Sequence, residues 1–188
     1  MQRRDFGKIL IPGMAAAGTL LQAADIPRDA PDLVITMPNG RAPIKLSQFK
    51  GKVIGLEFIL TYCSHCQRAS RTTDILYREY GPKGFQPVAA AINPGGDTMA
   101  YVRDLNLTFP VGSVSQDTCT SFMQHPAMLR LLMPQMAFID RNFKVVAQYS
   151  GDAPFFGESE EKNMRELLDK LLKPASNAAP AKKASKKS

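Results

Sequence analysis

The stretch FILTYCSHCQRAS, residues 58–70, contains two cysteines one helical turn apart, Cys63 and Cys66, directly after an apolar run. That run, VIGLEFIL at 53–60, is apolar at both its odd and its even positions except at Glu57. This pattern is typical of a central strand covered on both faces. The residues after Cys66 are apolar or aromatic at helical spacing, which indicates a helix. The stretch therefore predicts a buried strand that leads into a helix, with the cysteine pair at the junction.

The chain on either side of this junction alternates extended and helical patterns, which predicts an α/β sandwich. The segment 33–46 predicts a β-hairpin, because Asn39-Gly40 is a strong turn signal between two short extended runs. A helix expected at 117–132 should break near His125-Pro126. The other expected strands are 85–92, 109–114, 135–140 and 144–149, and the other expected helices are 66–80, 97–105 and 159–172.

The two ends of the chain predict appendages to a single domain at 24–173. Residues 1–23 contain paired arginines, Arg3-Arg4, then a Gly- and Ala-rich apolar stretch, and they are similar to a twin-arginine export signal. A Sec signal and an uncleaved membrane anchor are the alternatives. Residues 174–188 consist mainly of Pro, Ala, Ser and Lys, which predicts a disordered, lysine-rich tail. We therefore expect an exported protein, periplasmic or anchored to the membrane by its first segment and facing outward.

The formal net charge of +7 is concentrated at these two ends. Residues 1–23 contribute +2 and residues 174–188 contribute +4, which leaves +1 for residues 24–173. A nucleic-acid-binding domain needs a basic surface to neutralise phosphates. The charge distribution therefore argues against nucleic acid as a partner.

Three kinds of site use cysteines at the spacing of Cys63 and Cys66: a structural disulfide, a zinc site and a redox-active pair. A disulfide between residues three apart closes a very small loop and stabilises little. A structural zinc site commonly uses two such pairs, whereas this chain has three cysteines and two histidines in all. At the first turn of a helix, unpaired backbone N–H groups stabilise a thiolate, which is the form that attacks disulfides. The position of the pair therefore favours a redox function.

The order of strand, Cys63-Ser64-His65-Cys66, helix, and then Met133-Pro134 before a late strand hairpin resembles the thioredoxin superfamily. The early hairpin and the extra segment at 85–108 are most similar to its exported TlpA/ResA-like redoxin branch, and the resemblance covers residues 31–172. It implies a thioredoxin-like three-layer α/β/α sandwich with a central mixed sheet and an N-terminal β-hairpin. It also implies a monomeric thiol–disulfide oxidoreductase without an organic cofactor, whose partners are protein thiols and disulfides and a membrane redox protein. The reductase and oxidase directions both stay open.

The resemblance also implies roles for the residues around the cysteine pair. Cys63 would attack a substrate disulfide, and Cys66 would then resolve the mixed disulfide. Glu57 matches a buried acid of the superfamily and would exchange a proton with Cys66. His65 would stabilise the neighbouring thiolate, as in oxidising members of the superfamily.

A second set of residues would bind the substrate. In the superfamily the late proline is cis and lies beside the disulfide, and the backbone of the preceding residue pairs with the substrate. Pro134 and Met133 match these positions. Tyr62 stands directly before the first cysteine, where these proteins usually have tryptophan, and it is expected to contact the substrate.

Two other functions stay open as alternatives. Sulfur and imidazole ligands suit Cu(I), as in Sco-like copper-delivery proteins, but those proteins carry C-x-x-x-C where this chain has C-x-x-C. The candidate copper ligands beyond the cysteine pair are Met123, His125, Met128, Met133 and Met136. A peroxiredoxin-like peroxidase would have a threonine three residues before its cysteine, whereas Thr61 lies two residues before Cys63.

Cys119 makes the number of cysteines odd, which is unusual in an exported protein. Three interpretations are open: a buried apolar residue on the 117–132 helix, a resolving thiol, or a partner in an intermolecular disulfide. The neighbouring Phe122 and Met123 favour burial.

Overall fold

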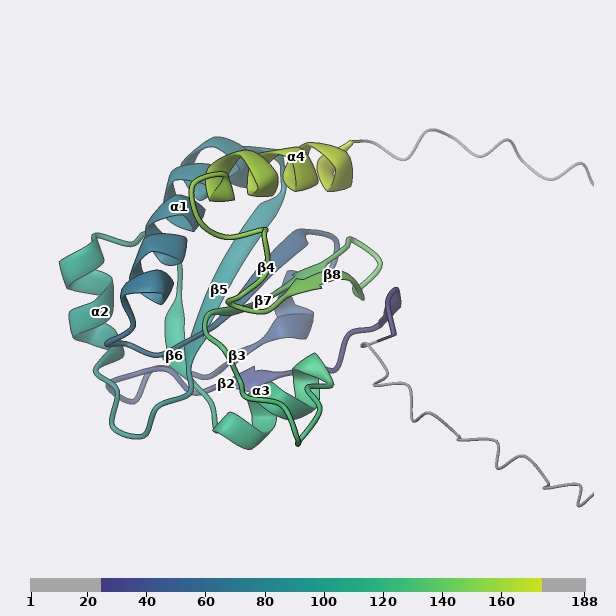
Figure 1. The fold of residues 1–188 in the computed structure, drawn as a ribbon. Helices are drawn as coiled ribbons and strands as arrows, with labels where there is room; N and C mark the ends of the chain where they lie inside the picture. Colours follow the sequence, from purple (N-terminus) through teal and green to yellow (C-terminus); the bar gives the residue numbers. More distant parts are fainter. Residues whose placement is uncertain (1–24, 174–188) are drawn as a thin grey trace, which may run out of the picture.

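The centre of the structure is a six-stranded mixed sheet with the strand order β1-β8-β7-β4-β5-β6 (Figure 1). The strands are β1 (Arg28–Asp29), β4 (Val53–Ile59), β5 (Phe85–Ala91), β6 (Val111–Ser113), β7 (Gln135–Ile139) and β8 (Lys144–Tyr149). β4, β5 and β6 run parallel, whereas β7, β8 and β1 join by antiparallel pairing. This computed structural model describes residues 25–173, in which no helix has the length and apolarity of a membrane span. The export signal expected at 1–23 and the tail expected at 174–188 lie outside the described residues.

β4 confirms the expectation of a central strand, because all seven of its residues are buried. It pairs with β5 on one side and β7 on the other, which places Glu57 between Ala89 and Met136. Alternate side chains of β4 enter different cores: Leu56 packs on one face of the sheet and Val53 on the other. The near-continuous apolar run is thus explained by two covered faces.

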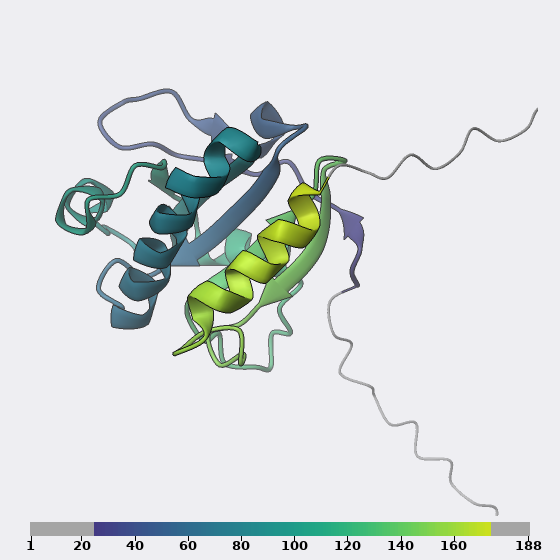
Figure 2. The same cartoon turned by 90° about the horizontal axis from the view of Figure 1, so that it is seen from above.

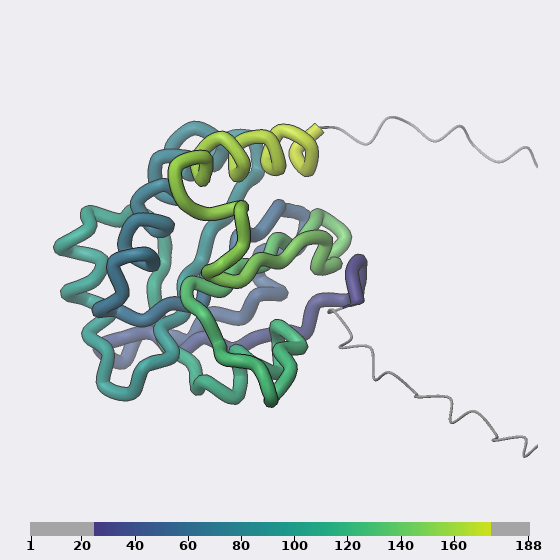
Figure 3. Tube along the Cα trace, viewed as in Figure 1, coloured from purple at the N-terminus to yellow at the C-terminus, as the bar shows by residue number. Residues whose placement is uncertain are grey.

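Helices and a hairpin cover the two faces of the sheet. One face carries α1 (Ser64–Tyr80), α2 (Thr98–Leu105) and α4 (Glu160–Leu172), and the other carries α3 (Gln116–Met123) with the hairpin of β2 (Val34–Ile35) and β3 (Ile44–Lys45). Short 3-10 turns follow β3 at Leu46–Phe49 and α1 at Gly81–Lys83. The tube in Figure 3 shows the hairpin and α3 on the side opposite α1 and α4. The three-layer α/β/α sandwich with an N-terminal β-hairpin is therefore confirmed.

The hairpin turn has the backbone that its sequence predicts. Within residues 36–43, which join β2 to β3, Asn39 and Gly40 both have positive φ, at 56° and 66°, and Arg41 N donates to Pro38 O at 3.3 Å, as in a type I′ turn. The flanking strands pair antiparallel, with Val34 opposite Lys45.

The structure differs from the sequence-based expectation in two places. The break expected near His125-Pro126 is present, but the helix expected at 117–132 does not resume after it. α3 ends at Met123, because Gln124 adopts a left-handed conformation (φ 50°) that closes the last turn and Pro126 cannot continue a helix. Residues 124–134 instead form a non-helical connection to β7. β1 is not predicted, since two residues are too few to show a period; it pairs with the outer edge of β8.

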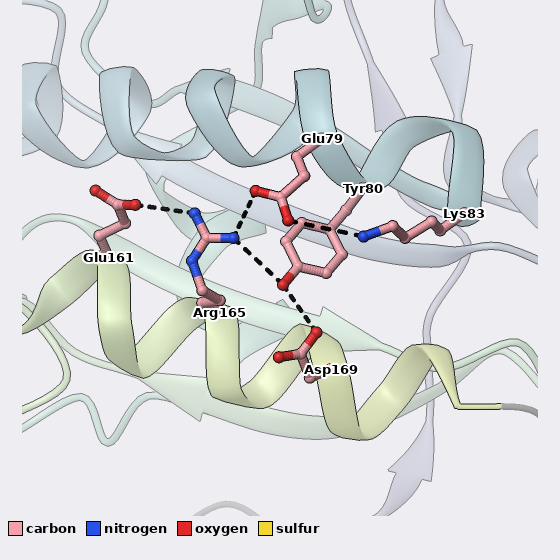
Figure 4. A network of polar contacts seen from close by, with 6 residues as sticks. All are labelled: Glu79, Tyr80, Lys83, Glu161, Arg165 and Asp169. Carbon is pink, nitrogen blue, oxygen red and sulfur yellow. Dashed lines mark hydrogen bonds and ion pairs between the residues drawn. The ribbon is translucent and has the colours of Figure 1, made fainter.

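α1 and α4 lie side by side over the sheet (Figure 2). Figure 4 shows their polar contacts: Arg165 of α4 donates to Glu79 of α1, and Tyr80 Oη donates to Asp169 Oδ1 at 2.8 Å. Exposed ion pairs contribute only about 0–1 kcal/mol each to stability. The apolar cluster beneath the two helices, which includes Met164, therefore holds them in place.

Candidate active site

The cysteine pair lies where β4 passes into α1, as the sequence predicts. Cys63 is the residue that caps the N-terminus of α1, and its sulfur is half-buried. Its backbone N–H donates to Leu60 O at 3.0 Å, and its carbonyl accepts from Gln67 N at 3.0 Å. Cys66 is fully buried beneath it, one helical turn into the protein. The two cysteines are therefore unequal: Cys63 is partly exposed and Cys66 lies in the core.

The environment of Cys66 keeps its thiol protonated. Burial raises the pKa of Cys66 far above its ordinary value, and the neighbouring Cys63 and Glu57 raise this pKa further. A thiol in this position needs a nearby base before it can attack a disulfide.

Glu57 provides a buried carboxyl behind the pair. Its side chain is fully buried on β4, where it accepts hydrogen bonds from Ser70 Oγ at 2.7 Å and from Thr73 Oγ1. Burial raises its pKa from 4.5 to about 7, against the opposing effect of the two hydroxyls, and Glu160 of α4 raises it further. A carboxyl that titrates near neutral pH can both accept and release a proton under physiological conditions. The structure thus places Glu57 as expected, and its role in proton exchange stays a prediction.

The Met133-Pro134 peptide bond is cis, and Pro134 is buried at the start of β7. Met133 and Cys63 pack against the same buried cluster, which also contains Cys66. Gly151 packs closely against this segment. Its N–H donates to Leu132 O at 3.1 Å, and a Cβ at this position would collide with the Met133 carbonyl. The structure thus packs Met133 and both cysteines around one buried cluster, and substrate binding by Met133 and Pro134 stays a prediction.

Tyr62 and His65 lie on the outer side of the junction. Tyr62 is 72% exposed, so it lies at the surface directly before Cys63, and its contact with a substrate stays a prediction. His65 is also exposed, on the first turn of α1. Beside Tyr62 there is a hollow of about 200 Å³ between the junction and α2; it is lined by Thr61, Tyr62, Gln67, Asp97, Ala100, Tyr101, Asp104 and Leu105.

Several residues that shape the site are absent from the sequence-based prediction. Asn93 holds the loop before Cys63, because its amide donates to Thr61 Oγ1 and its carbonyl accepts from Thr61 N, both at 3.1 Å. Ser70 and Thr73 bind Glu57, and they share the inward stripe of α1 with Cys66, at spacings of four and seven residues. Hydroxyl residues on an otherwise apolar stripe are a signal that could have identified them.

The comparisons with known proteins agree with this geometry. Residues 27–168 match the family model described as Redoxin. The chain belongs to the Redoxin family. It is 27% identical over 148 residues to the thiol-disulfide oxidoreductase ResA of Bacillus thuringiensis subsp. konkukian, covering 78% of this chain and 79% of ResA. The ResA of Bacillus anthracis is 29% identical over 129 residues, covering 68% of this chain and 70% of ResA.

A solved structure shares the fold of this redoxin. The DsbE-type thiol:disulfide interchange protein of Chlorobium tepidum superposes with a TM-score of 0.67 at 25% identity, covering 79% of this chain and 98% of that protein. The resemblance to TlpA/ResA-like members of the thioredoxin superfamily is confirmed. This redoxin is accordingly an oxidoreductase of the thiol–disulfide type.

The remaining sulfur residues are not gathered around the pair. Cys119 is fully buried on α3, on the opposite face of the sheet from Cys66, and burial raises its pKa to about 12. Met123 shares the cluster of Cys119, whereas Met136 lies in a cluster on the other face and Met128 is 96% exposed. Within residues 25–173, no group of three or more His, Cys, Asp or Glu side chains could hold a metal ion. Of the three interpretations of Cys119, burial on α3 is therefore the one that the structure supports.

Proposed function

We propose that this redoxin is exported and exchanges disulfides with protein substrates through Cys63 and Cys66. The unequal burial of the two sulfurs carries the proposal: Cys63 is half-buried at the start of α1, and Cys66 is fully buried in front of a carboxyl, Glu57. The amino-terminal pattern of residues 1–23 supports export.

In the reducing direction, the Cys63 thiolate attacks one sulfur of a substrate disulfide, and the other substrate sulfur leaves as a thiolate. Cys66 then passes its proton to the Glu57 carboxylate and attacks Cys63. The Cys63–Cys66 disulfide forms, the bond between Cys63 and the substrate breaks, and the substrate has gained two electrons. The same steps in reverse oxidise a substrate dithiol.

Three further residues support this chemistry from the outside. The backbone of Met133, which packs with Cys63 against one buried cluster, would pair with an extended substrate segment, and the exposed ring of Tyr62 would offer an apolar contact. His65, on the exposed side of the first turn, favours the thiolate. The pair needs no organic cofactor, and the redoxin works as a monomer with a membrane redox partner that restores the starting state of the pair.

Covalent trapping tests the assignment of the two sulfurs. Cys66→Ser should accumulate mixed disulfides with partner proteins through Cys63, because attack proceeds and resolution does not. Cys63→Ser should trap almost none, and Cys119→Ser is the matched control that leaves the exchange unchanged. Trapping by the Cys63→Ser variant would exchange the two roles, and trapping by neither variant would remove the proposed function.

The direction of exchange follows from the reduction potential. A titration against glutathione that gives a value near −270 mV, roughly that of thioredoxin, indicates a reductase. A value near −120 mV, roughly that of DsbA, indicates an oxidase.

A further inference from the structure

A chain of hydroxyl groups leads away from the buried Glu57 carboxyl. Ser70 Oγ lies 2.7 Å from Glu57 Oε2 and 3.0 Å from Tyr101 Oη. Ser70 is fully buried and Tyr101 is 4% exposed, so bulk water does not compete for these contacts. Tyr101 comes from α2, and it lines the hollow of about 200 Å³ that opens beside Tyr62. Three oxygen-bearing groups therefore connect the carboxyl with the wall of a solvent-facing hollow.

The other contacts of Glu57 offer no comparable path. Thr73 also binds the carboxyl, but its second contact is with Met164 Sδ at 3.6 Å, and a thioether sulfur cannot carry a proton onward. Glu160 on α4 faces Glu57 as a second buried acid, and its influence raises the pKa of Glu57. Among the hydrogen bonds of the described residues, only the one between Glu57 and Ser70 continues to another hydroxyl group, that of Tyr101.

We propose that Ser70 and Tyr101 relay protons between Glu57 and water in the hollow beside Tyr62. The relay rests on the proposed function, in which Glu57 must be ionised before it can take the proton from Cys66. A protonated Glu57 must therefore release its proton before resolution, and it must do so again after each cycle. Both are positioning residues, because they act on the reaction through Glu57.

Each hydroxyl group of the relay receives one proton and gives up another, so it is unchanged at the end. Protonated Glu57 passes its proton to Ser70 Oγ, the Ser70 hydroxyl proton passes to Tyr101 Oη, and the Tyr101 proton passes to a water molecule. When the Cys63–Cys66 disulfide is reduced again, a proton moves inward through the same groups. Burial, together with Glu57 and Cys66, raises the pKa of Tyr101 above its ordinary value, so the phenol stays neutral between transfers.

The relay is tested by the rate of resolution in a single turnover. The reduced redoxin is mixed at pH 7 with a peptide disulfide carrying a fluorophore, and the Cys66→Ser variant isolates the first attack from the resolution step. We expect Tyr101→Phe to slow resolution by about tenfold, less than the roughly 10²- to 10⁴-fold of a directly acting acid or base, because Glu57 remains. Ser70→Ala should slow resolution at least as much, since it removes both contacts of the chain.

A relay changes rates and leaves equilibria alone, which separates it from a structural role. The reduction potential and the first attack of Tyr101→Phe should match those of the unaltered protein. Tyr80→Phe is the matched control: it loses the same atom from a tyrosine whose hydroxyl contacts Asp169 between α1 and α4 (Figure 4). It should resolve at the unaltered rate.

Two results would overturn the relay. One is an unaltered resolution rate in Tyr101→Phe, and the other is a slow resolution rate accompanied by a shifted reduction potential, which would indicate a structural effect. Failure of the proposed function is a separate outcome, because the unaltered protein would then form no mixed disulfide through Cys63.

Discussion

Replacing the buried acid by its amide, Glu57→Gln, should make the redoxin more stable at neutral and alkaline pH. Below pH 4.5 this carboxyl is protonated in both the folded and the unfolded chain, so it adds no pH dependence there. Above pH 4.5 the unfolded carboxyl ionises first, the folded protein holds more protons than the unfolded chain, and the free energy of unfolding falls as the pH rises. The fall ends above pH 7, where the folded carboxyl is ionised too.

The size of the effect follows from the change in pKa. A rise from 4.5 to about 7 corresponds to about 3 kcal/mol, at about 1.4 kcal/mol per pH unit. Glutamine is neutral at every pH and keeps nearly the same shape, so the variant avoids this loss. At an m value of about 2 kcal/mol/M, its urea midpoint at pH 8 should exceed that of the unaltered protein by about 1.5 M.

The assay is urea unfolding of both reduced proteins at intervals from pH 4 to pH 9. The contributions of the titratable groups that both proteins share cancel in the difference between them. Glu158→Gln, which changes an exposed carboxyl beside α4, is the control and should leave the pH profile unaltered. If Glu57→Gln showed the same fall in stability between pH 5 and pH 8 as the unaltered protein, the raised pKa of Glu57 would be refuted.

Two further predictions concern other parts of the molecule. Gly151→Ala should place a Cβ against the Met133 carbonyl and destabilise the protein by about 1–3 kcal/mol. The rate of disulfide exchange should fall more with protein substrates than with dithiothreitol. Equal losses with both substrates in steady-state kinetics would contradict a role in substrate pairing. Cys119, whose pKa is raised from 9.0 to about 12, should hold about 10³-fold less thiolate at pH 8 than an ordinary thiol. Iodoacetamide should therefore label it rapidly only after denaturation of the oxidised protein, and rapid labelling of the native protein would count against its burial.

The buried acid links the stability of this redoxin with its proposed chemistry. Glu57 is held in a site that disfavours its ionised form, although the hydroxyls of Ser70 and Thr73 partly compensate. An apolar residue at the centre of β4 would avoid this penalty. We interpret the acid as a feature retained for proton exchange at some loss of stability.

The local elements of this fold could be read from the sequence, because each depends on neighbouring residues. The apolar run of β4, the turn at Asn39-Gly40, the inward stripe of α1 and the position of the cysteine pair between them all follow from periodicity and turn chemistry. The buried position of Glu57 followed from the same pattern, since an acid inside a two-faced strand has no exposed side.

Contacts between distant segments were decided only by the tertiary structure. The strand β1 depends on which backbone groups find partners across the fold. The meeting of Ser70 with Tyr101 requires α1 and α2 to pack on one face of the sheet, and the contact of Gly151 with Met133 requires the chain after β8 to return to the start of β7. Periodicity along a chain states which face of an element is buried, but the order in which strands pair determines which buried faces meet.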